Sequence, residues 1–214
     1  MPKEKKKNNT VELIARQIRE DITKSSFKSS QHLKEGYFVK KFGVSRVPVR
    51  EAFRILHSEG YIDMIPNKGS FVKKITKKDI EEIALIYKLL APVVLDAAIP
   101  NYKKSTYKQI EEIIIKVEHC KDFSEVGYFL WEFAKTIFGP SKLTFFLELF
   151  DKMYRNNIRS LNEIFEASEH KQYDTSDHRE FLRLCKLKKK KEAIDTWTKH
   201  ISKIESLNLK LRSN

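Results

Sequence analysis

Cysteines are scarce in this sequence of 214 residues, and long apolar runs are missing. Cys120 and Cys185 have no paired spacing with each other or with a histidine, which excludes a disulfide framework and a zinc finger and leaves both as reduced core residues. No run reaches the roughly eighteen apolar residues that a transmembrane helix needs, and the start MPKEKKKNNT lacks the apolar segment of a secretory signal. The sequence therefore predicts a cytoplasmic protein without a membrane partner.

Catalytic fingerprints are also missing. The chain contains no G-x-S-x-G element, no P-loop, no H-E-x-x-H motif and no dinucleotide-binding glycine pattern. The adjacent carboxylates of Glu111 and Glu112 fall on what reads as an ordinary solvated helix face. The sequence therefore predicts a binding protein and not an enzyme.

Positive charge is abundant and unevenly distributed. The formal net charge is +13. Residues 1–75 hold 17 Lys and Arg against 8 Asp and Glu, whereas residues 76–214 hold 25 against 21. A basic excess concentrated in one part of a chain favours an anionic partner, although charge alone is equally typical of a soluble lysine-rich protein.

The first 75 residues are expected to form a basic tail, three helices and a hairpin. The Lys/Asn run 1–9 is predicted to be disordered, because it has nothing to bury. Thr10 can cap the first helix, Gly43 can end the second, and Ser45 can cap a third that runs to Gly60. Two short β-prone runs follow around the turn 66–69. This order predicts a winged helix-turn-helix over residues 10–75.

Residues 76–214 show helical periodicity with few strand signals. The helices are expected at 77–99, 104–121, 123–138, 142–165, 176–187 and 191–209. The fold class is therefore mainly α: an N-terminal winged helix-turn-helix and an all-α helical bundle over residues 76–214.

The third helix of the N-terminal domain carries the sharpest signal. Its apolar residues are spaced three or four apart and can pack inward: Val49, Ala52, Phe53 and Leu56. Arg46, Arg50 and Arg54 then follow one another at four-residue steps on the opposite side. The planar guanidinium fork can bond O6 and N7 of guanine together in a major groove. The alternative is a solvated face whose arginines pair with Glu51 and Glu59.

The segment from Leu33 to Val72 resembles the winged helix-turn-helix of the GntR family of bacterial regulators. The resemblance rests on fixed residue types at fixed spacing, namely Leu33, Glu35, Gly43 to Arg46, Pro48 to Ala52, Glu59-Gly60 and the wing's Pro-Asn-x-Gly-x-x-Val from Pro66 to Val72. It implies that Ser45, Arg46 and Arg50 contact double-stranded DNA in the major groove, that Gly69 approaches the minor groove, and that Lys68 meets phosphate. Val47 and Arg54 of the same helix are expected to bind DNA as well. The family often has a basic residue where this chain has Gly36, so one DNA contact is expected to be missing.

The helical half is similar to the FCD-type effector domain of the FadR-like branch of that family. In that domain an Asp and a His on one helix join two later histidines around a divalent metal such as zinc. His178 and His200 match the later pair, whereas Gly127 and Trp131 stand at the first two positions, where neither can bind metal. A metal site would need Glu132, Tyr128 or water as substitutes, and two histidines hydrogen-bonded inside a bundle are the favoured alternative.

An indole N–H can bond to an organic molecule but cannot coordinate a cation. We therefore expect an effector pocket near Trp131, His178 and His200 that takes an organic molecule, whose identity the sequence does not reveal. These features together predict a sequence-specific regulator, a repressor that binds a palindromic operator as a homodimer. The alternative is a constitutive or architectural DNA-binding protein whose C-terminal domain only dimerises.

Overall fold

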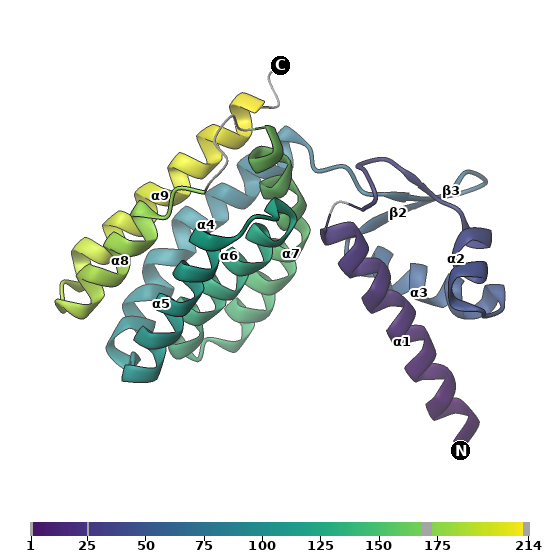
Figure 1. The fold of residues 1–214 in the computed structure, drawn as a ribbon, viewed down its shortest axis with the longest axis horizontal. Coiled ribbons are helices and arrows are strands. Elements are labelled where there is room, and N and C mark those ends of the chain that lie inside the picture. The colour runs from purple at the N-terminus through teal and green to yellow at the C-terminus, as the bar shows by residue number, and fades with distance from the viewer. Residues whose placement is uncertain (1, 25, 168–172, 212–214) are drawn as a thin grey trace. The chain divides into compact units, whose positions relative to one another are not determined.

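The computed structural model describes residues 2–24, 26–167 and 173–211. For residues 2–9, 123–124, 155–157, 159–167 and 211 it describes the backbone only. The chain divides into two compact units, Met1–Ile75 and Thr76–Asn214 (Figure 1). Each unit has its own buried core.

The N-terminal unit contains three helices: α1 (Pro2–Thr23), α2 (Glu35–Phe42) and α3 (Arg46–Ser58). The apolar residues of α1 recur at helical spacing, and Ile14, Ile18 and Ile22 are almost fully buried. They pack with Phe38 of α2 and Phe53 of α3 in one core. The amphipathic patterns of the three helices therefore meet around a single apolar centre.

The start of α1 differs from the prediction. The structure extends the helix to Pro2, so residues 2–9 are helical where a disordered tail is predicted, and Thr10 lies inside the helix instead of capping it. The physical reason is that lysine and glutamate have favourable helix propensity. Adding residues to a helix that has already formed is also far easier than nucleating a new one.

A small antiparallel sheet completes the N-terminal unit. Its strands are β1 (His32–Leu33), β2 (Ile62–Ile65) and β3 (Gly69–Val72), in the order β1-β3-β2. Ile65 faces Gly69 across the hairpin, whose turn holds Asn67 at φ 60°. The hairpin is the predicted wing, whereas β1 is not predicted from the sequence.

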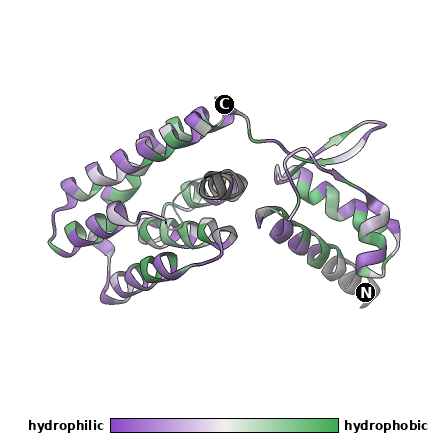
Figure 2. Cartoon of the chain, turned by 45° about the horizontal axis from the view of Figure 1, so that its top comes forward, coloured by the Kyte–Doolittle hydropathy of each residue, from purple (hydrophilic) through white to green (hydrophobic). Residues whose placement is uncertain are grey.

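The C-terminal unit is a helical bundle, as predicted. Its helices are α4 (Lys77–Ala98), α5 (Lys104–His119), α6 (Phe123–Phe138), α7 (Thr144–Ala167), α8 (Ser176–Lys186) and α9 (Lys190–Leu211), with short 3-10 turns at Ile99–Asn101 and Gly139–Ser141. Thr76 and Asp79 cap the start of α4 reciprocally. Figure 2 shows polar and apolar residues distributed around the helices, as expected for elements that each bury one face.

Helix α4 is unusually apolar. By length and composition alone, residues 77–101 would suffice to cross a membrane, and no other stretch in the described part of the chain does so. The prediction that such a stretch is absent is therefore wrong. Lys88 and Asp96 interrupt the apolar run in the sequence, but two charges do not remove the apolar character of the whole helix. In the structure both charges are paired within the bundle, Lys88 with Glu205 and Asp96 with Lys190.

Candidate nucleic-acid interface and ligand cavity

The turn between α2 and α3 is built by two residues with different backbone needs. Gly43 ends α2 in the left-handed conformation, at φ 64° and ψ 35°, which costs a glycine little. Ser45 is the N-cap of α3, and its side chain makes no capping hydrogen bond. An exposed serine thus lies at the positive end of the α3 helix dipole.

Helix α3 has one buried and one exposed face. Its buried residues are the four that the sequence predicts: Val49, Ala52, Phe53 and Leu56. Arg46, Arg50 and Arg54 are all exposed, and Val47 is 52% exposed beside them. The predicted arginine stripe therefore exists as a surface of α3.

The arginines of this stripe differ in their partners. Arg50 donates from Nε to both carboxylate oxygens of Glu35, at 2.9 and 3.0 Å. Arg54 pairs with Glu51 at 2.7 Å, as the alternative reading of a solvated face expects. Glu59 instead accepts two hydrogen bonds from Arg19 of α1, at 2.8 and 2.7 Å. The exposed pairs of Arg50 and Arg54 contribute little to stability. They orient the two side chains, which stay accessible at the surface.

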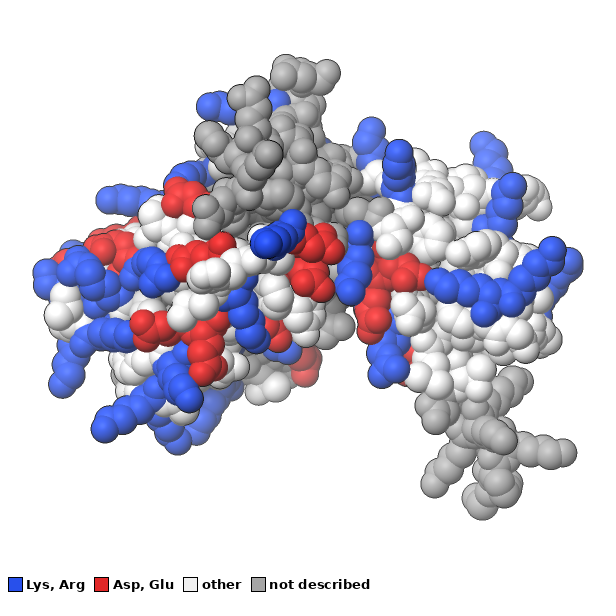
Figure 3. Space-filling model, in the orientation of Figure 1, with Lys and Arg blue, Asp and Glu red and all other residues white. Residues whose placement is uncertain are grey.

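The wing presents Lys68 and Gly69 at its turn, both exposed. Gly69 has a structural reason to be glycine: its φ is 101°, and a Cβ there would lie 2.7 Å from Nε2 of His32. The His32 ring stacks on Phe71 at 4.7 Å between centroids. The glycine thus lets the wing fold close against β1. On the visible face of this unit, Lys and Arg outnumber Asp and Glu (Figure 3).

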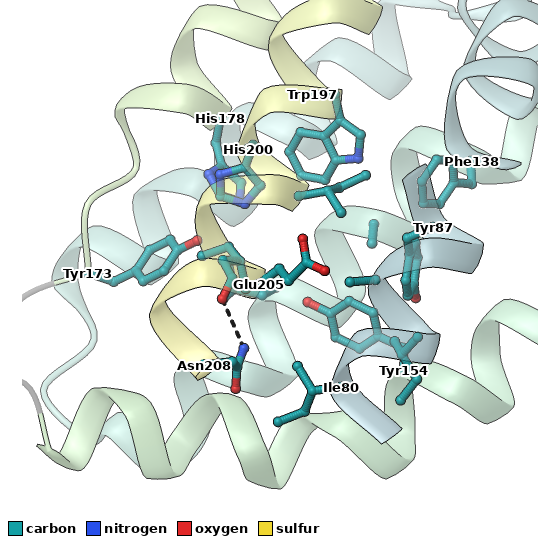
Figure 4. Close-up of a pocket in the computed structure, with 16 residues that line it drawn as sticks. Ile80, Tyr87, Phe138, Tyr154, Tyr173, His178, Trp197, His200, Glu205 and Asn208 are labelled. Carbon is teal, nitrogen blue, oxygen red and sulfur yellow. Dashed lines mark hydrogen bonds between the residues drawn. The ribbon is translucent and has the colours of Figure 1, made fainter. Parts of the chain in front are cut away.

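The C-terminal unit contains a partly open cavity of about 90 Å³ between α4, α6, α7, α8 and α9 (Figure 4). We call it the aromatic cavity, because five of the residues that line it carry benzene or indole rings: Tyr87, Phe138, Tyr154, Tyr173 and Trp197. His178 and His200 line it as well.

The two histidines predicted to converge do lie together. Their ring centroids are 4.6 Å apart, and both side chains are buried. Nδ1 of His200 is 3.0 Å from Oδ2 of Asp177, and this hydrogen bond lowers the pKa of Asp177. Burial lowers the pKa of His178 well below its ordinary value, and the neighbouring His200 lowers it further. His178 is therefore neutral near pH 7.

Trp131, the third residue expected in the pocket, lies elsewhere. Its Nε1 donates to Oδ1 of Asp151 at 3.0 Å, and Lys135 lies 4.3 Å from its ring centroid. The residues of α6 that line the cavity follow one another at steps of four, namely Leu130, Ala134 and Phe138. Trp131 is one residue further along than Leu130, about 100° around the helix from it, and its indole is directed to Asp151. Trp197 of α9 supplies the indole of the cavity instead.

The residues present do not fit the metal site of FCD-type domains. No cavity-facing residue of α6 carries a ligand atom, and neither Glu132 nor Tyr128 lines the cavity. In the part of the chain that the structure describes, no three His, Cys, Asp or Glu side chains gather closely enough to hold a metal ion. Two imidazoles alone fall short of the ligand number that divalent ions require.

Known proteins resemble both units. Residues 10–72 match the sequence profile described as bacterial regulatory proteins, gntR family. Over 170 residues the chain is 26% identical to an uncharacterized HTH-type transcriptional regulator, YdhC of Bacillus subtilis, covering 76% of this chain and 70% of that protein. It is also 28% identical over 158 residues to the gluconate operon transcriptional repressor of the same species, covering 71% of this chain and 61% of the repressor.

The whole fold has counterparts among solved structures. The E. coli protein McbR/YncC matches with a TM-score of 0.80 at 18% identity, covering 96% of this chain and 99% of that one. At this identity the likeness concerns the fold alone. The sequence matches identify the chain as a GntR-family helix-turn-helix transcriptional regulator, and not an enzyme. Its all-helical C-terminal domain is consistent with the FadR-like branch.

Proposed function

We propose that this DNA-binding regulator is a sequence-specific repressor that recognises a palindromic operator as a homodimer and responds to a small organic effector. The single observation that carries the DNA part is the exposed arginine stripe of α3, backed by a fully buried opposite face. A helix fixed in this way can enter a major groove without losing its packing. The relative that is a named repressor supports the sign of regulation.

Each DNA-facing residue has a proposed role. Arg46 and Arg50 read base edges near the start of α3, with Val47 between them and Ser45 at the dipole end. Arg54 and Lys68 bind phosphates, and Gly69 allows the wing backbone to approach the minor groove. The basic excess of the N-terminal unit supports these roles because phosphate contacts supply much of the affinity for DNA.

Dimerisation is proposed through residues 76–214, and the exposed face of α4 supports it. Leucine side chains project from this helix at four-residue spacing, Leu85 55% and Leu89 63% exposed, and Val93 continues the line at 64%. An exposed apolar stripe of this length is typical of a protein interface. A single helix can pair with its own copy across a two-fold axis, and that symmetry matches two operator half-sites. A regulator of this kind works in the bacterial cytoplasm.

The aromatic cavity is the proposed effector site. It is lined by helices distant in sequence, so that filling it can shift their packing and change DNA affinity. A constitutive DNA-binding protein is the competing function, and the poor fit of a metal at this site favours it.

One experiment tests the proposal. Binding sites are selected from random DNA with the full chain, and affinities for the selected and scrambled duplexes are compared at physiological salt. A regulator is expected to prefer a palindrome by about a thousandfold or more, and some metabolite in a panel is expected to weaken that binding. A sequence-independent affinity that no metabolite changes would establish the constitutive alternative.

A further inference from the structure

The aromatic cavity combines neutral ring faces with one carboxylate. Burial raises the pKa of Tyr87, Tyr154 and Tyr173 above the ordinary value of a phenol, so these rings stay uncharged at any physiological pH. Ring faces of tyrosine and tryptophan attract cations through their quadrupole. The lining is therefore of the kind that favours a positive group over a negative one.

Glu205 supplies the negative charge. Its carboxylate and the hydroxyl of Tyr154 point into the space between the labelled residues in Figure 4. It is the one Asp, Glu, Lys or Arg among the described residues that line the cavity. Its present partner is Nζ of Lys88, at 2.7 Å, and both side chains are partly buried, 18% exposed for Glu205 and 32% for Lys88. The carboxylate thus already holds an ammonium group at the edge of the cavity.

Two further polar atoms in the lining are buried without a partner. Among the described residues, neither the hydroxyl of Tyr87 nor Nδ1 of His178 has a hydrogen-bond partner. Leaving such groups unpaired costs about 1–3 kcal/mol each, so native proteins rarely do it without a ligand or water that pairs with them. Both atoms belong to the same cavity as Glu205.

We propose that the aromatic cavity binds a small organic ammonium ion, whose charged nitrogen lies against Glu205 and the tyrosine rings and whose apolar body lies beside Trp197. This proposal rests on the effector role given above and names the class of the effector. An organic anion is disfavoured because it would face the Glu205 carboxylate beside a neutral His178. A volume of about 90 Å³ exceeds that needed for one water several times over, so a small molecule has room.

The test uses three probes of similar shape and different charge: benzylamine, benzyl alcohol and benzoate. Each is titrated calorimetrically into the full chain near pH 7. Benzylamine is expected to bind most tightly, benzyl alcohol more weakly and benzoate least, because only the first carries a cation for Glu205. Benzoate binding as tightly as benzylamine, or no binding of any probe, would overturn the proposal.

Two variants at the ion pair separate charge recognition from a general effect on folding. Glu205→Gln is expected to weaken benzylamine binding by about tenfold or more while leaving benzyl alcohol nearly unchanged, because a partly buried charge partner is lost. Lys88→Met is expected to tighten benzylamine binding by about two- to fivefold, because the resident cation no longer competes. The control Glu180→Gln removes a carboxylate from an exposed pair on α8 and is expected to change nothing.

The two variants are expected to change benzylamine affinity in opposite directions. This matters because a misfolded Glu205→Gln protein would also lose binding, whereas Lys88→Met cannot gain binding by misfolding. Benzylamine affinity that is the same in both variants would refute the ammonium site. Operator affinity, measured with and without benzylamine, distinguishes the two proposals. Benzylamine binding that depends on Glu205 but leaves operator affinity unchanged would retain the ammonium site and refute its role as an effector site.

Discussion

Replacing Arg50 by alanine tests how this protein reads DNA. Its side chain is 58% exposed and contacts Glu35 only through Nε, so its removal opens no cavity in the core. The stability of the N-terminal unit is therefore expected to change little. The variant loses the two terminal nitrogens of the guanidinium group. In the parent protein these nitrogens do not contact Glu35 and can bond guanine.

The expected loss follows from that geometry. One bidentate contact between arginine and guanine is worth about tenfold to a hundredfold in discrimination against the wrong base. A dimer on a palindrome makes the contact twice, so the two losses multiply to roughly 10²–10⁴. On DNA that carries a single half-site, only the smaller factor is expected. Glu35→Gln should have a milder effect, because the arginine remains but loses the partner that orients it.

The assay is fluorescence anisotropy with the selected operator, a half-site duplex and a scrambled duplex, at two salt concentrations. Arg183→Ala is the matched control, because Arg183 is also 58% exposed and paired through its guanidinium with a carboxylate, that of Glu180. Arg50→Ala should bind scrambled DNA almost as well as the parent protein. Wild-type affinity for the operator would refute base reading by Arg50, and an equal loss on all three duplexes would make Arg50 a phosphate contact.

Three further predictions address the wing, the dimer and the buried histidine. Lys68→Ala is expected to weaken binding to operator and scrambled DNA alike and to reduce the salt slope by about 1.8, since each subunit of the dimer loses one phosphate contact worth about 0.9; a loss confined to the operator would contradict this role. Leu89→Asp is expected to sediment as a monomer at micromolar concentration, whereas Ile115→Asp on α5, an apolar position that is 44% exposed, should remain dimeric; a dimeric Leu89→Asp protein would place the interface elsewhere. Because folding lowers the pKa of His178, the unfolded chain takes up the extra proton below pH 6.5. The free energy of unfolding should then fall by at most about 1.4 kcal/mol per pH unit as the pH drops below 6.5 toward the lowered pKa of folded His178, and His178→Gln should remove that slope in urea titrations. The loss of stability below the ordinary aspartate pKa of 3.8 should persist in this variant, because Asp174, with a pKa of about 2, and Asp177 keep their interactions.

The sequence by itself determined the elements whose signals are local. The buried and exposed faces of α3 follow from a period of 3.6 residues, and the wing follows from the turn 66–69, which requires left-handed backbone at Asn67 and Gly69. Motif spacing also identified the family of the N-terminal unit. None of these inferences depends on residues far away in the chain.

The short strand β1 shows where local signals end. Two residues carry no periodicity, and His32–Leu33 becomes a strand only because β3 offers hydrogen-bonding groups alongside. The same hairpin brings Gly69 against His32, a contact between residues 37 positions apart that no local pattern contains.

The cavity was decided by tertiary structure alone. A one-residue error in aligning α6 turns a side chain by about 100°, which is why Trp131 was expected in a site that Trp197 occupies. Tyr87, Tyr154 and Glu205 come from three different helices, and no spacing along the sequence brings them together. Only the packing of those helices removes their side chains from water and brings a carboxylate, aromatic faces and a neutral histidine around one space, because burial and convergence are properties of the folded chain and not of spacing along it.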